Sequence, residues 1–118
     1  MTQENKDLLL RDLCARLPYG VKLQVPYEDG SGYFDETVWE VNNEGPFHVN
    51  GWGIEYEYVK PYLFPLSSIT KKTLEELSAY IDIKNAYVAV EFFNSHHIDY
   101  RGLIEKGLAI DATGLNIY

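Results

Sequence analysis

The chain has 118 residues, a single cysteine and a formal net charge of −8 at pH 7. This length predicts one domain, residues 1–118, large enough to bury a core without disulfides. One cysteine excludes an intramolecular disulfide and a thiolate zinc cluster, and the acidic balance disfavours direct nucleic-acid binding. No apolar run approaches the ~20 residues of a membrane span, and the polar N-terminus does not resemble a signal peptide. We therefore expect a cytoplasmic protein.

An amphipathic helix is expected over residues 3–17. Thr2 can cap its start, and Pro18 ends it by restricting the residue before it. The apolar side chains that recur at helical spacing, and so predict its buried stripe, are Leu9, Leu10, Leu13, Cys14 and Leu17. The charged residues expected to face elsewhere are Asp7, Arg11 and Asp12. This pattern predicts that Cys14 is buried among leucines and unreactive.

A change to alternating apolar and polar residues follows the helix. The runs that predict short strands are 21–25, 37–42, 47–49 and 54–58. Glycine-containing turns at 28–32, 42–46 and 50–53 separate them. Together they predict a four-stranded antiparallel meander with one face in water. Such a segment could close into a small SH3-like barrel or stay an open sheet covered by helices.

The remaining third of the chain is expected to be mainly helical. Residues 60–66 contain Pro61 and Pro65, so they are predicted to form an irregular bridge rather than a central strand. Helices are predicted at 70–81 and 99–106, and 84–97 fits either a helix or a strand, with its length favouring a helix. The sequence pattern does not place the tail, 108–118. The predicted class is α+β: an N-terminal helix, the meander, and two to three C-terminal helices.

Three stretches carry a resemblance to a known family. They are residues 7–21 (DLLLRDLCARLPYGV), 60–70 (KPYLFPLSSIT) and 94–109 (NSHHIDYRGLIEKGLA). Together they cover about a third of the chain and resemble a family of uncharacterised small proteins from anaerobic gut bacteria, their prophages and mobile elements. The family commonly has Arg where Phe64 stands and Met where Ile69 stands. The resemblance implies a bacterial, phage-associated, intracellular origin and supplies no catalytic residue.

The histidines and the polar residues that follow them are one candidate site. Neighbouring side chains on a helix point about 100° apart, so His96 and His97 cannot both bind one metal ion, and no metal or cofactor is expected. His97, Asp99 and Arg101 could surround a small ligand or form the centre of a small enzyme. The competing interpretation is a helix junction, with Asp99 as a cap, Arg101 paired with an acidic residue and Tyr100 packed on the sheet. We favour the junction, because it accounts for every residue.

A second candidate is an acidic, aromatic face of the predicted sheet. Its residues are Tyr33, Trp39, Trp52, Glu55, Tyr56, Glu57 and Tyr58. Exposed rings beside carboxylates suit a basic or proline-rich peptide, although the same rings could instead fill the core. The hypothesis favoured is a non-catalytic protein-interaction module with a protein or peptide partner, no membrane and no direct nucleic-acid contact. An acidic nucleic-acid mimic that occupies a basic cleft of a host protein is an alternative.

Overall fold

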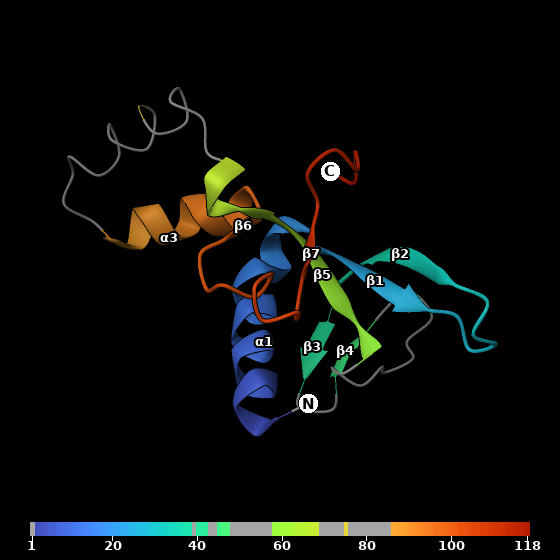
Figure 1. Ribbon diagram of the computed structural model, residues 1–118. Helices are drawn as coiled ribbons and strands as arrows, with labels where there is room; N and C mark the ends of the chain where they lie inside the picture. The colour runs from blue at the N-terminus through green and yellow to red at the C-terminus, as the bar shows by residue number, and fades with distance from the viewer. Residues whose placement is uncertain (1, 39, 43–44, 48–57, 69–74, 76–85) are drawn as a thin grey trace.

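The computed structural model describes residues 2–38, 40–42, 45–47, 58–68, 75 and 86–118 (Figure 1). Its first element, helix α1, spans Gln3–Arg16 and starts where predicted: the Thr2 hydroxyl accepts a hydrogen bond from the Asn5 amide at 3.1 Å. A turn of 3-10 helix, η1 (Leu17–Tyr19), follows. Gly20 then redirects the chain into the sheet. Its φ of +68° is a left-handed conformation that costs glycine little, because glycine has no Cβ.

The sheet is mixed, has five strands and is not closed into a barrel. The strand order is β2-β1-β5-β6, and β7 also pairs with β5. The strands are β1 (Lys22–Pro26), β2 (Tyr33–Thr37), β5 (Lys60–Pro65), β6 (Ile98–Asp99) and β7 (Ile110–Asp111). The β1–β2 and β1–β5 pairs are antiparallel, whereas β6 and β7 run parallel to β5. The α+β class and the N-terminal helix are confirmed, but the simple antiparallel meander is not what forms.

The prediction for residues 60–66 is wrong, because residues 60–65 form β5, which pairs with three other strands. The prolines stand near its two ends, where Pro61 lies opposite Leu23 and Pro65 lies opposite Asp99. Each neighbouring strand pairs with only two residues of β5. Because β5 pairs with each neighbour over so few residues, it tolerates the two amide donors that its prolines lack. A strand that is hydrogen-bonded continuously along its length would not.

The strand expected at 37–42 is divided between two elements. Thr37 ends β2, and residues 40–42 form β3 (Glu40–Asn42), which pairs with β4 (Gly45–Phe47) in a separate two-stranded sheet. The expected turn at 28–32 is confirmed between β1 and β2, where Tyr27 donates its amide hydrogen to the Gly32 carbonyl at 2.9 Å. The strand expected at 54–58 and the helix expected at 70–81 lie mostly outside the described residues.

The C-terminal part is less helical than predicted. Helix α3 (Ala86–Ser95) settles the ambiguous segment as a helix, and it lies at the opposite end of the sheet from the β1–β2 hairpin (Figure 1). Residues 99–106 were expected to be a helix, but Asp99 ends β6 and the residues that follow form bends and turns. The tail contributes β7. In the described part of the chain, no helix combines the length and apolar character needed to cross a membrane.

The core lies between α1 and the inner face of the sheet. Its buried hydrophobic cluster consists of Leu9, Leu13, Val21, Leu23, Val25, Val38, Val59, Leu63, Leu103, Leu108 and Ala109. The four fully or almost fully buried positions of α1 are Leu9, Asp12, Leu13 and Arg16. The buried positions recur at the expected helical spacing, but the buried stripe is shifted by one residue towards the N-terminus relative to the predicted one. Cys14 is therefore exposed, contrary to its predicted burial, and Asp12 is buried, contrary to its predicted exposure.

Candidate functional site

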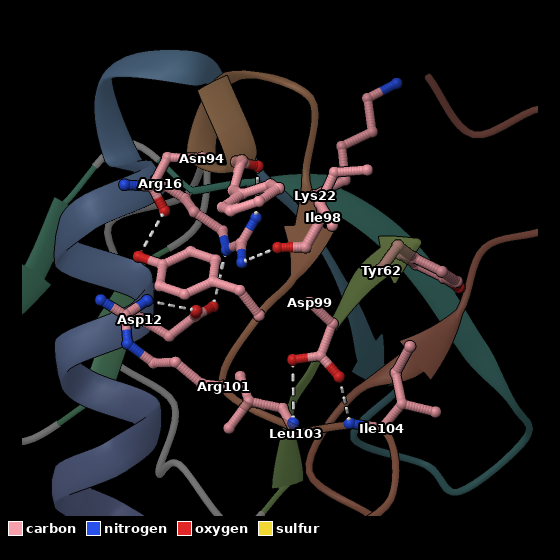
Figure 2. Close-up of polar contacts among 12 residues, drawn as sticks. Asp12, Arg16, Lys22, Tyr62, Asn94, Ile98, Asp99, Arg101, Leu103 and Ile104 are labelled. Atoms are coloured by element: carbon pink, nitrogen blue, oxygen red, sulfur yellow. Dashed lines mark hydrogen bonds and ion pairs between the residues drawn. The ribbon is translucent and has the colours of Figure 1, made fainter. Parts of the chain in front are cut away.

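Asp12 and Arg16 form the centre of a buried polar cluster beneath α1. Both side chains are fully buried, and the Arg16 Nε donates to the Asp12 carboxylate at 2.8 Å. The second Asp12 oxygen accepts from Arg101 Nη1 at 2.7 Å (Figure 2). Arg16 also donates to the backbone carbonyls of Phe93 and Ile98. One guanidinium thus connects α1 with α3 and β6, and its charge is compensated where it is buried.

Tyr100 lies between the two guanidinium groups. Its ring centroid is 4.4 Å from the Arg101 Cζ and 5.5 Å from the Arg16 Cζ. It stacks on Phe93 of α3 at 5.6 Å, and its hydroxyl donates to Asn94 at 3.0 Å. The expected packing of Tyr100 on the sheet is therefore replaced by packing on α3.

His97, Asp99 and Arg101, the polar set identified from the sequence, contact different partners. The Asp99 carboxylate accepts from the Leu103 and Ile104 amides at 2.9 Å each, capping a turn (Figure 2). Arg101 pairs with Asp12. These contacts match the junction interpretation in the roles of Asp99 and Arg101, except that the capped segment is a turn. Within the described residues, no three His, Cys, Asp or Glu side chains gather to hold a metal ion.

His97 has a third and different environment. It occupies the left-handed conformation at φ +56° after α3, and its carbonyl accepts from the Phe64 amide at 2.8 Å. Its ring is stacked on the Tyr118 ring at a centroid distance of 3.9 Å and an interplanar angle of 11°. Burial, followed by the nearby Arg16 charge, lowers the pKa of His97 to about 4. The imidazole is therefore neutral at pH 7, and its buried Nδ1 has no hydrogen-bond partner among the described residues.

The outer face of the sheet, opposite the core, carries a second group of polar and aromatic side chains. The β1–β2 and β1–β5 registers place the following side chains on this face: Lys22, Gln24, Tyr33, Asp35, Lys60 and Tyr62. All of them are exposed or half-buried except Tyr62, which is buried. The Tyr62 hydroxyl donates to the Asp35 carboxylate at 2.5 Å. Burial and the Asp35 carboxylate raise the pKa of Tyr62 to about 12, so this hydroxyl stays protonated at neutral pH.

The aromatic residues proposed from the sequence are placed only in part. Tyr33, with 63% of its surface exposed, lies on β2, and Tyr58, with 57%, precedes β5. The other members of that set, which lie outside the described residues, are Trp39, Trp52, Glu55, Tyr56 and Glu57. Tyr27, next to the hairpin turn, is also exposed and contacts Phe34 at a ring distance of 5.1 Å.

Sequence reasoning overlooked four residues that organise these two regions: Asp12, Arg16, Tyr62 and Tyr118. Asp12 and Arg16 carried a signal, because opposite charges four positions apart on a helix commonly pair. That spacing does not distinguish a buried pair from a surface pair. Tyr118 carried no signal, because its role depends on the tail crossing β1 and β5. Comparison of the chain with protein-family models, curated proteins and solved structures found no match, so only the chemistry of its own side chains bears on its function.

Proposed function

We propose that this chain is a non-catalytic protein-interaction module that binds a basic peptide on the outer face of its sheet. One observation carries the proposal: the exposed Tyr33 ring and the exposed Asp35 carboxylate stand two positions apart on β2. Side chains at this spacing project from the same face of a strand. A lysine or arginine can therefore contact the ring and the carboxylate together.

The Asp35 carboxylate is held in place before any partner arrives. Its hydrogen bond from the Tyr62 hydroxyl fixes one oxygen and leaves the carboxylate exposed on the face of β2. Tyr62 is itself anchored in the sheet, where β5 pairs with β1 and β7. A pre-positioned acceptor lowers the ordering cost of binding, which favours this position as the contact point.

Further negative charge lies at the end of the same hairpin. Glu28 and Asp29 are exposed in the turn between β1 and β2. The Asp29 carboxylate accepts from the Ser31 amide at 2.9 Å, and hydrogen bonding from Ser31 lowers the pKa of Asp29, which keeps it ionised. With Asp35 these groups form an acidic edge that attracts a basic segment over the distance of ionic screening.

Calorimetric titration with two synthetic peptides of equal length tests this proposal. One peptide is rich in lysine, arginine and proline, and the other has glutamate in place of each basic residue. The basic peptide should bind, and Tyr33→Ala and Asp35→Asn should each weaken it about tenfold, or ~1.4 kcal/mol. Asn at position 35 keeps an acceptor for Tyr62, so the change isolates the charge.

Leu66→Ala is the matched control, because Leu66 is an exposed apolar side chain (49%) in η3, Leu66–Ser68, after β5. It should leave the affinity unchanged. Binding should also weaken as the salt concentration rises from 50 to 500 mM, because the electrostatic screening length falls from about 14 to about 4 Å. Equal binding of both peptides, or a Leu66→Ala effect as large as that of Tyr33→Ala, would contradict the proposal.

A further inference from the structure

The Tyr118 hydroxyl takes the place of a direct hydrogen bond between β1 and β5. The antiparallel register pairs Gln24 with Lys60 and Leu23 with Pro61, so Lys22 and Tyr62 stand next in line. The Lys22 amide donates instead to the Tyr118 hydroxyl at 2.8 Å, and that hydroxyl donates to the Tyr62 carbonyl at 2.8 Å. One phenol oxygen therefore satisfies both backbone groups.

The ring of Tyr118 is held as specifically as its hydroxyl. It is stacked on the buried His97 at 3.9 Å, and the Phe64 ring lies 6.0 Å away, tilted by 52°. The Lys22 ammonium lies 5.9 Å from the ring centroid. The residues around this side chain, Lys22, Tyr62, Phe64 and His97, are called the Tyr118 site from here on. They contact both the flat ring and the hydroxyl of a phenol.

The segment that delivers Tyr118 is itself exposed. Thr113, Gly114, Leu115 and Asn116 are exposed, and Leu115 leaves 48% of its surface in water. The last tie before this segment is the Ala112 amide, which donates to the Leu63 carbonyl at 2.8 Å beside β7. Beyond that point, Lys22 Nζ donates to the Ile117 carbonyl at 2.7 Å. No residue of 113–118 belongs to the core cluster, so release of this segment would remove no core side chain.

We propose that the Tyr118 site is an exchangeable binding site for a tyrosine side chain, filled by residues 113–118 within the chain and by a tyrosine-bearing extended segment of a partner protein on binding. This inference rests on the proposed interaction function, because Tyr62 belongs to both regions. Its hydroxyl holds Asp35 on the peptide-binding face and its carbonyl holds Tyr118. A partner lying across the outer face would reach both.

The hydrogen-bond geometry specifies tyrosine over related side chains. The phenol oxygen must accept one hydrogen bond and donate another. Phenylalanine offers neither, and it would leave the Lys22 amide and the Tyr62 carbonyl without this partner. A phosphorylated tyrosine has lost the phenol proton and cannot donate to the Tyr62 carbonyl. Tyr118 leaves 44% of its surface exposed, and the partial burial of its hydroxyl raises the pKa to about 12, so it keeps the required proton at physiological pH.

The test uses the full chain with Tyr118→Ala and a fluorescein-labelled, amidated peptide, Thr-Gly-Leu-Asn-Ile-Tyr, which copies residues 113–118. Fluorescence anisotropy should show binding to Tyr118→Ala. The wild-type chain should bind at least tenfold more weakly, because its own Tyr118 competes at a high effective concentration. Peptides ending in phenylalanine or phosphotyrosine should also bind at least tenfold more weakly to Tyr118→Ala.

Circular dichroism establishes whether Tyr118→Ala is folded. If it is not, Tyr118→Phe serves instead, and the tyrosine peptide should bind this variant more tightly than the wild-type chain. No binding to the folded variant, or equal binding of all three peptides, would overturn the proposal. A concentration-dependent dimer of the wild-type chain that Tyr118→Ala abolishes would also overturn it and assign the site to a second copy.

The result is separable from the fate of the basic-peptide proposal. Tyr33→Ala combined with Tyr118→Ala should bind the tyrosine peptide as tightly as Tyr118→Ala alone. Failure of one proposal would then be distinguishable from failure of the other, because the first is read from the effect of Tyr33→Ala on a basic peptide and the second from the effect of Tyr118→Ala on a tyrosine peptide.

Discussion

Asp12 and Arg16 lie one turn apart on α1, are both fully buried, and are joined by an ion pair of 2.8 Å. They occupy two of the four innermost positions of a helix whose other two innermost side chains are leucines. The pair is tied to α3 and β6 through carbonyl groups that Arg16 reaches, and to Arg101 through the second carboxylate oxygen (Figure 2). A polar cluster of this kind fixes how the helix sits on the sheet.

Asp12→Ala should strongly destabilise the fold. It leaves the buried Arg16 guanidinium without its counter-charge, and breaking one partner of a buried pair costs about 3–5 kcal/mol. Urea denaturation followed by circular dichroism measures the change. Asp7→Ala is the control on the same helix, since Asp7 is exposed and accepts only from Gln3 among the contacts described. It should change the free energy of unfolding by less than about 0.5 kcal/mol. Similar values for both variants would contradict the assigned role of Asp12.

Asp99→Ala should cost about 2–4 kcal/mol, because it removes the acceptor of two backbone amides at once. Asp99 is buried, and both its oxygens accept at 2.9 Å, from Leu103 and Ile104. Asp111→Ala is a matched comparison: Asp111 accepts one amide, that of Thr113, at the same distance but in an exposed position. Thermal unfolding should show a larger drop for Asp99→Ala. The reverse order would show that the turn at 103–107 does not depend on this cap.

The stability of the protein should fall as the pH is lowered from about 6.5 to about 4. The pKa of His97 is lowered to about 4 in the fold, against 6.5 in an unfolded chain. The unfolded state therefore binds the proton first, and the stabilisation present above pH 6.5 is lost progressively, on the order of 3 kcal/mol. His97→Asn, which tolerates the left-handed backbone, should flatten this part of the pH profile. His96→Asn, at an exposed neighbour whose charge is the smallest of the three causes of this shift, should change the profile much less. An identical profile for His97→Asn and the wild-type chain would contradict the assignment.

Cys14 should react with a thiol reagent such as DTNB in the native state, within about tenfold of its rate in denaturant. It is exposed on α1 and is the only cysteine, so the reaction has one site. Cys14→Ser should change stability by less than about 0.5 kcal/mol, whereas Leu13→Ala, at a fully buried neighbour, should cost about 2–5 kcal/mol. A thiol that reacts only after unfolding would show that the buried stripe includes Cys14.

Local signals in the sequence were enough for several elements. Thr2 and the apolar spacing marked α1, and the glycines at 30 and 32 marked the turn between β1 and β2. The alternation of Val21, Leu23 and Val25 marked β1. Each of these elements depends on side chains within a few positions of one another, so the local sequence pattern is enough to predict it.

Other features depend on contacts between distant segments. Pro61 and Pro65 argued against a strand, but β5 forms because β1, β6 and β7 each supply a short stretch of partners. The periodicity of α1 predicted the width of its buried stripe, but it did not determine the rotation of the helix about its axis to within one residue. That rotation is set by what the helix meets, which includes the Phe93 and Ile98 carbonyls that Arg16 satisfies.

The chain by itself determined the α+β class, the first helix, the first hairpin and the crowding of tyrosines and carboxylates between residues 27 and 62. Only the tertiary structure decided that Asp12 is buried, that Asp35 is held by Tyr62, and that Tyr118 lies between β1 and β5. Hydrogen bonds that join residues 27 and 96 positions apart leave no periodic trace in a sequence, because the packing of the whole chain determines which residues meet.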